Sequence, residues 1–77
     1  MKDDKKIILK NRKFVIKKDN VLKTLKLFKK NFSINKKQAP FEIYYYLVSE
    51  NILFLDPTKG LLKPQSKLTW HAIKEIS

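Results

Sequence analysis

The chain has 77 residues and no cysteine, which excludes a disulfide framework and any thiolate metal site. Its formal net charge of +11 is large for one small domain, and such a charge repels itself unless an anionic partner is bound. Hydrophobic residues still make up 43% of the sequence, so a folded core is expected rather than a disordered chain. Length and composition together predict one small domain over residues 1–77 with a thin core.

The positive charge is concentrated in the first half of the chain. Residues 1–37 contain 14 Lys and Arg against 3 Asp and Glu, whereas residues 38–77 contain 4 of each kind. A domain whose lysines served only for solubility would intersperse both signs along its length. The asymmetry therefore predicts that the first half builds a basic surface for a polyanion.

No targeting or membrane segment is expected from the sequence. The apolar run that follows the charged start consists of Ile7, Ile8 and Leu9 alone, whereas a secretory signal needs about 7–15 apolar residues. A membrane span needs about 20 apolar residues, and no stretch of the sequence approaches that length. We therefore expect a cytoplasmic protein without a membrane partner.

Residues 6–18 predict a basic β-hairpin that follows a frayed start at residues 1–5. Its arms are Lys6–Lys10 and Lys13–Lys17, joined at Asn11-Arg12, because Asn tolerates the positive φ that a two-residue turn needs. The expected register pairs Ile7 with Ile16 and Leu9 with Phe14 on one face. The other face then carries lysines around two apolar residues, namely Lys6, Lys10, Lys13, Lys17, Ile8 and Val15.

The next segment predicts an amphipathic helix over residues 21–32, capped by Asp19-Asn20. One side carries apolar residues at helical spacing, and the opposite side carries lysines. The apolar set is Val21, Leu22, Leu25, Phe28 and Phe32, and the basic set is Lys23, Lys26 and Lys30 with Lys29 beside them. Lys36 and Lys37 fall in the loop that follows.

The second half predicts a helix, a hairpin and a final helix. Pro40 suits the first turn of a helix over 39–50, which is apolar nearly all round and should lie in the core. Strands at 52–55 and 61–63 then flank a turn at 56–60. Ser66 caps a last helix over 67–76, whose buried face is expected to carry Leu68, Thr69, Ala72, Ile73 and Ile76.

The order of elements over residues 21–76 resembles a winged helix, with helix, loop, helix, two-stranded wing and helix. More narrowly, Ile52–Pro64 followed by Ser66–Ile76 is similar to the winged-helix tail of some archaeal ATPases. The nucleotide-binding machinery of those ATPases is absent from the sequence, so the resemblance implies a fold and no enzymatic role. The predicted fold class is thus α+β in the order ββ-α-α-ββ-α, winged-helix-like over 20–76 with an extra N-terminal β-hairpin.

One feature departs from a DNA-binding winged helix. The helix before the wing usually enters the major groove, and in this sequence that helix is 39–50. It contains Glu42 and Glu50 but no Lys or Arg, which makes it a poor groove reader. The resemblance therefore implies that any binding face lies on the lysine-bearing N-terminal elements.

Catalysis has little support in the sequence. His71 is the one histidine, and the acidic residues are scattered without the spacing of a metal site or an acid–base pair. Gly60 is the one glycine, so a glycine-rich phosphate loop cannot be built. We expect no enzymatic activity, no catalytic residue, no cofactor and no metal.

The lysines predict contacts to phosphates rather than to bases. Lysine acts as a point charge, whereas base reading favours Arg, Asn and Gln in a groove, and Arg12 is the one arginine. Backbone recognition is therefore expected instead of sequence specificity. The predicted nucleic-acid-binding residues are Lys6, Lys10, Arg12, Lys13, Lys17, Lys23, Lys26, Lys30, Lys36 and Lys37.

Trp70 lies away from the expected buried face of the last helix and has two interpretations. It could stack on a base or anchor a partner protein, or it could cover one of the two hairpins, which is the favoured interpretation. With Lys59 of the wing turn, it forms the candidate pair of partner contacts. Tyr44, Tyr45 and Tyr46 follow one another in a helix, so at least one hydroxyl should reach solvent or a partner.

These observations favour a small structural component of a ribonucleoprotein such as the ribosome, in contact with RNA and with other proteins of the assembly. The first alternative is a winged-helix DNA-binding protein of chromatin or transcriptional regulation. The second is a protein-interaction module that uses Trp70 and the tyrosine-bearing helix, with lysines that only aid solubility. A membrane-surface helix at 21–32 is a weaker fourth hypothesis, because core packing explains its apolar face.

Overall fold

The computed structural model of the protein describes residues 5–9 and 11–76. The predicted frayed start lies outside the described residues as far as residue 4, and Lys5 begins the first strand. The elements in chain order are β1 (Lys5–Leu9), β2 (Arg12–Ile16), α1 (Lys18–Lys26), the 3-10 turn η1 (Leu27–Lys29), β3 (Ile34–Asn35), the 3-10 turn η2 (Lys36–Gln38), α2 (Phe41–Ser49), β4 (Leu53–Asp56), β5 (Leu61–Pro64) and α3 (Lys67–Lys74).

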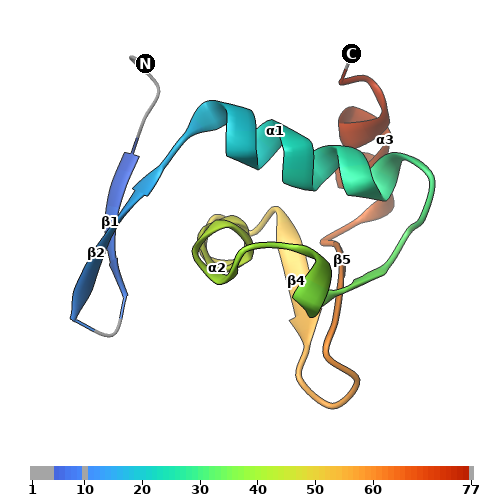
Figure 1. Ribbon diagram of the computed structural model, residues 1–77. Coiled ribbons are helices and arrows are strands. Elements are labelled where there is room, and N and C mark those ends of the chain that lie inside the picture. The colour runs from blue at the N-terminus through green and yellow to red at the C-terminus, as the bar shows by residue number, and fades with distance from the viewer. Residues whose placement is uncertain (1–4, 10, 77) are drawn as a thin grey trace.

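The described residues form a small α+β domain with two sheets and three helices, which confirms the predicted class. Strands β1 and β2 make a two-stranded sheet, hereafter the N-terminal hairpin, and the second sheet has the order β3-β5-β4. Strands β4 and β5 form the C-terminal hairpin, which projects at the bottom of Figure 1, while α1 crosses the top. The short strand β3 was not expected, because two residues carry too little pattern to predict a strand.

The N-terminal hairpin exists, but the predicted register is wrong. Ile7 lies opposite Phe14, and the ladder closes at Leu9 and Arg12, so Arg12 belongs to β2 and not to the turn. Asn11 adopts a φ of 65°, as an Asn in a tight turn can. Each pairing is shifted by two residues, and an even shift leaves every side chain on its expected face. Ile16 is accordingly buried.

Helix α1 begins earlier than predicted, and the expected cap is absent. Its N-cap residue is Lys17, with no side-chain hydrogen bond, while Asp19 lies within the first turn. An acidic residue in the first turn lies near the positive end of the helix dipole, so Asp19 stabilises the helix without a capping hydrogen bond. The helix tightens into η1 after Lys26, so Phe32 lies beyond the helix rather than on its apolar face.

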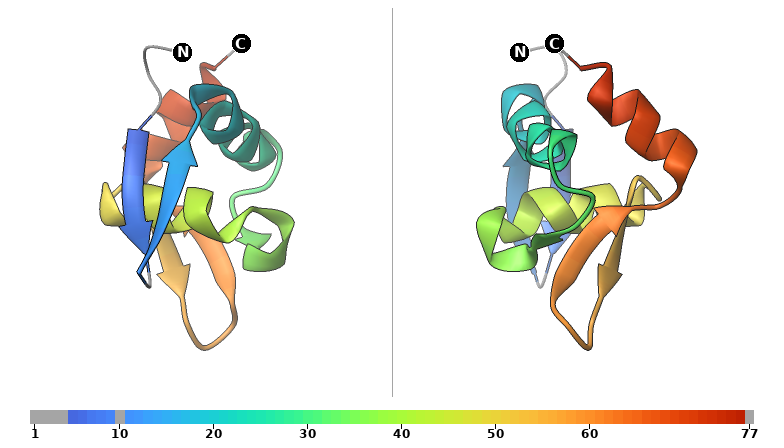
Figure 2. Two further views of the ribbon diagram at one scale, coloured as in Figure 1. Left: turned by 60° about the vertical axis from the view of Figure 1, so that its left-hand side comes forward. Right: turned by 90° about the vertical axis from the view of Figure 1, so that its right-hand side faces the viewer.

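Helix α2 lies at the centre of the fold, as its sequence predicts. It contacts β2, α1 and β4, and Figure 2 shows it running below α1 and across the N-terminal hairpin. Ile43 and Leu47 are buried between these elements, and both face the core. Asn51 ends the helix with a φ of 61°, and the Ile52 N–H donates to the Leu47 carbonyl at 2.9 Å.

Helix α3 begins at the predicted cap but does not bury the predicted face. The Thr69 N–H donates to Ser66 Oγ at 3.1 Å, as an N-cap serine requires. Ile73 is buried, whereas Leu68 is 81% exposed and Ala72 is exposed. The helix packs on η1 and β5 through the side that carries Ile73 and Trp70, which turns Leu68 outward.

Burial makes a testable distinction between two leucines that sequence alone places in the core. Leu47→Ala is expected to lower the free energy of unfolding by about 2–5 kcal/mol, because it opens a cavity beside α2. Leu68→Ala is expected to change that free energy by no more than about 0.5 kcal/mol, because the side chain is already solvated. Urea denaturation of both variants measures the difference, and similar losses would contradict the placement of α3.

Candidate interaction surfaces

The predicted basic residues fall into three groups rather than one surface. Four lie on or beside the N-terminal hairpin, three lie along α1 and just beyond η1, and two lie in η2. All of those described are exposed, and Lys10 lies outside the described residues. In order, the groups are Lys6, Arg12, Lys13 and Lys17, then Lys23, Lys26 and Lys30, then Lys36 and Lys37.

The first two groups lie on consecutive elements, since β2 leads into α1 at Lys17. The third group is carried away to the C-terminal hairpin. The Lys36 N–H donates to the Gly60 carbonyl at 2.9 Å, and the aliphatic stem of Lys36 would lie 3.6 Å from a Cβ placed on Gly60. The lysines of the hairpin and of α1 thus lie on elements that follow one another in the chain, whereas Lys36 and Lys37 lie beside the C-terminal hairpin.

The outer face of the N-terminal hairpin combines charge with exposed apolar area. Ile8 is 68% exposed and Val15 is 49% exposed. Lys6 lies opposite Val15, and Lys13 lies opposite Ile8, so lysine and aliphatic side chains alternate across the two strands. These four residues, Lys6, Ile8, Lys13 and Val15, are hereafter called the hairpin outer face.

Trp70 packs on the end of the first helical segment, whereas the sequence predicted that it would cover a hairpin. Its indole N–H donates to the Phe28 carbonyl at 2.7 Å, and its ring meets Phe32 edge-on with centroids 5.0 Å apart. Lys74 Nζ lies 3.9 Å from the indole centroid, within cation–π range. Lys29 Nζ adds a hydrogen bond to the Ile76 carbonyl. The half-buried Trp70 thus holds α3 against the end of the first helical segment.

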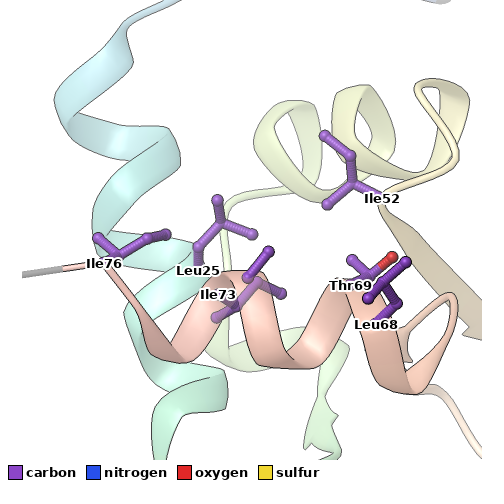
Figure 3. A pocket seen from close by; sticks show the side chains of 7 residues that line it. Leu25, Ile52, Leu68, Thr69, Ile73 and Ile76 are labelled. Carbon is purple, nitrogen blue, oxygen red and sulfur yellow. The ribbon is translucent and has the colours of Figure 1, made fainter.

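An open apolar groove of about 380 Å³ lies between α3, α1 and the turn into β4. Figure 3 shows Leu68 and Thr69 at one end, opposite Ile52, and Ile76 at the other end beside α1. Its lining is Leu25, Ile52, Leu68, Thr69, Ala72, Ile73 and Ile76. Sequence reasoning placed most of these residues in the core and so missed the groove, although their stripe on α3 was the signal that marks it.

The three tyrosines divide as their helical spacing requires. Tyr44 is buried, whereas Tyr45 is exposed and lies 5.6 Å from Phe41 between ring centroids. Tyr46 is half-buried. The exposed Tyr45 satisfies the expectation that one hydroxyl of the three reaches solvent.

The C-terminal hairpin uses its polar residues to build its turn. Asp56 accepts hydrogen bonds from the Thr58 N–H at 3.0 Å and the Lys59 N–H at 3.3 Å, which holds Lys59 exposed at the tip. Gly60 has a φ of 65°, which a glycine adopts without strain. Among residues 5–9 and 11–76, no group of three His, Cys, Asp or Glu could hold a metal ion.

None of the helices within the described residues is long and apolar enough to cross a membrane. The predicted cytoplasmic location stays a prediction.

Residues 2–77 match the family described as the C-terminal domain of uncharacterized ATP-binding proteins similar to MJ1010. The chain belongs to this family. It is 56% identical over 61 residues to the protein named Uncharacterized ATP-binding protein MJ0801 from Methanocaldococcus jannaschii, a match that covers 79% of this chain and 16% of that protein. It is 49% identical over 71 residues to Uncharacterized ATP-binding protein MJ0147 from the same organism, covering 92% of this chain and 19% of that protein.

A solved structure supports the same family. The fold matches the crystal structure of the C-terminal domain of a possible ATP-binding protein from Methanocaldococcus jannaschii, with a TM-score of 0.91 and 42% identity. The match covers 96% of this chain and 72% of that chain. The chain thus spans less than a fifth of the two curated relatives, and a domain like it has been crystallised apart from the rest of its protein.

Family membership corrects the predicted function. The relatives are named ATP-binding proteins, and this chain corresponds to their C-terminal domain, which does not fit a component of the ribosome or another ribonucleoprotein. The predicted RNA or DNA partner is therefore wrong, and so is the chromatin alternative. The error arose because a positive net charge indicates a negatively charged partner, but does not distinguish nucleic acid from an acidic protein surface.

The role of Trp70 in holding α3 in place can be tested by substitution. Trp70→Phe is expected to lower the free energy of unfolding by about 1–3 kcal/mol, because the Phe28 carbonyl loses its donor in a partly buried site. Lys74→Gln removes only the cation–π contact and should cost about 0.5–1 kcal/mol. Urea denaturation followed by circular dichroism compares them, and a smaller loss for Trp70→Phe would refute this role.

Proposed function

We propose that this chain is a non-catalytic accessory domain of an ATP-binding protein, and that the nucleotide is bound by a part of the protein outside it. Family membership carries the proposal, because the relatives named for ATP binding are matched over only 16–19% of their length. In this proposal the domain acts by contacting the nucleotide-binding part or its partners, rather than by chemistry of its own.

The residues of this domain support a nucleotide site outside it. A phosphate-binding loop needs several backbone N–H groups that small residues leave open, usually before a helix. The one glycine of the sequence, Gly60, sits instead in the C-terminal hairpin turn, against the stem of Lys36. Helix α3 begins at Ser66, whose hydroxyl already accepts the Thr69 N–H.

We further propose that the domain is winged-helix-like. The segment from α1 to α3 has the order helix, strand, helix, hairpin, helix, and β3 joins the C-terminal hairpin as its third strand. In this comparison the C-terminal hairpin takes the place of the wing, and the N-terminal hairpin is an addition. The buried helix α2 takes the place of the groove-reading helix, with Ile43 and Leu47 facing the core.

Nucleotide titration tests the proposed function. We expect the 77-residue chain to give no saturable heat with Mg-ATP up to about 1 mM, whereas the full-length relative MJ0801 binds it. The titration needs roughly 0.3 M salt, because a net charge of +11 attracts any polyanion when screening is weak.

Tripolyphosphate serves as the matched control, since it carries the charge of ATP without the nucleoside. One-to-one binding of ATP by the isolated chain, with no corresponding binding of tripolyphosphate, would show a nucleotide site in this domain. That result would end the proposal.

A further inference from the structure

The N-terminal hairpin is attached to the domain by one face only. Its two strands form a sheet of their own, separate from the β3-β5-β4 sheet. The inner face places Ile16 in the core and Ile7 and Phe14 against it. A two-stranded hairpin is marginally stable in water unless it packs on something, and here the packing covers half of it.

The uncovered half does not have the composition of a solvent face. Isolated exposed aliphatic residues are common and need no explanation. Here Ile8 and Val15 are diagonal neighbours on the same two strands and are both largely exposed. Lys6 and Lys13 flank them, and residues 5–9 and 11–17 contain no Asp or Glu. The hairpin outer face therefore combines a diagonal apolar pair with a diagonal pair of lysines.

The relatives indicate where a partner for this face would come from. In the family this domain is the C-terminal one, so the larger part of each longer protein precedes it and leads into β1. The hairpin is thus the element of this chain nearest in sequence to that part. A second copy of this chain is a poor occupant, because two molecules of charge +11 repel each other.

We propose that the hairpin outer face docks on an apolar, acidic-edged surface of the ATP-binding part of the longer protein. The inference rests on the proposed function, since it needs that part to exist beside this domain. Ile8 and Val15 supply apolar contact, and Lys6 and Lys13 pair with carboxylates at the rim. Rim charges of this kind orient partners and speed their association more than they add affinity.

Thiol labelling tests the proposal, because this chain has no cysteine and a single substitution gives the one thiol within it. Peptide mass spectrometry distinguishes its labelling from that of any cysteine in the host. The host is the full-length relative MJ0801 with this chain in place of its own C-terminal domain, to which it is 56% identical over 61 residues. Ile8→Cys is labelled with iodoacetamide in this chimaera and in the isolated chain. We expect labelling in the chimaera to be slower by roughly tenfold or more, which corresponds to a closed interface.

Two other substitutions serve as matched controls. Leu68→Cys probes another exposed aliphatic position, at the apolar groove, and Thr58→Cys probes the C-terminal hairpin turn. Both should react at similar rates in the chimaera and in the isolated chain. Protection of Leu68→Cys without protection of Ile8→Cys would place the interface at the groove and overturn the proposal, as would equal rates for Ile8→Cys in the two proteins.

Charge reversal tests the chemistry of the partner. Lys6→Glu with Lys13→Glu should speed labelling of Ile8→Cys in the chimaera by roughly threefold or more at about 0.1 M salt, where surface charges are incompletely screened. The comparison is the ratio of rates in the chimaera and in the isolated chain, which cancels the effect of the lysines on the thiol itself. An unchanged ratio would reject the proposal that the partner surface carries carboxylates opposite Lys6 and Lys13.

Further measurements separate the other outcomes. Protection of Ile8→Cys in the isolated chain that grows with protein concentration would identify a second copy as the occupant and reject the proposal. Protection that nuclease treatment removes would identify nucleic acid and reject it equally. If the chimaera does not fold, hydrogen exchange of the hairpin amides in unmodified MJ0801 and in its isolated C-terminal domain gives the same comparison.

Failure of this inference is distinguishable from failure of the proposed function. ATP binding by the isolated chain would refute the proposed function whatever the labelling rates are. An unprotected Ile8→Cys beside an isolated chain that does not bind ATP would refute the docking face alone.

Discussion

Burial of α2 is the constraint on which the rest of the structure depends. Its sequence is apolar nearly all round, so most of its surface must be covered, and Phe41 and Tyr45 mark the side that stays exposed. Three elements from different parts of the chain, namely β2, α1 and β4, cover it. Ile43 and Leu47 are consequently buried in a chain that is too short to build a larger core. The two hairpins contribute β2 and β4 to this cover, whereas α3 packs against η1, α1 and β5.

The distribution of charge follows from that arrangement. The second half of the chain supplies α2 and the three-stranded sheet apart from β3, and it has no net charge, whereas the first half supplies covering elements whose outer sides are free to carry lysine. The positive charge thus belongs to the elements that surround α2, and not to the core itself. Charge alone did not identify the partner, and membership of a family of ATP-binding proteins removes nucleic acid as the explanation. The same lysines fit a face that meets acidic protein surface.

The sequence predicted those elements whose pattern is local. Asn51 and Ser66 marked helix ends correctly, because a cap or a positive φ depends on a few neighbouring atoms. Pro40, predicted in the first turn, is the N-cap residue just before α2. The hairpin register was wrong because both registers bury the same face, so the residue pattern did not distinguish them. The start of α1 was wrong because the helix begins after Lys17, without the side-chain cap on which the prediction relied. Leu68 shows the limit most clearly, because its helical spacing indicates burial while the hydrogen bond from Trp70 to Phe28 holds α3 in another rotation. The sequence predicted which residues share the hairpin outer face, but it did not identify the partner that this face binds.

Zero-length cross-linking of the chimaera tests the central claim most directly, since carbodiimide joins a lysine to a carboxylate only when the two are in contact. Lys6 and Lys13 are exposed on the hairpin outer face, and Lys59 and Lys67 are exposed elsewhere on the domain. The docking account predicts that Lys6 or Lys13 is joined to Asp or Glu of the ATP-binding part, in a product that is monomeric by mass. Cross-links to that part from Lys59 or Lys67, with none from the hairpin outer face, would contradict it.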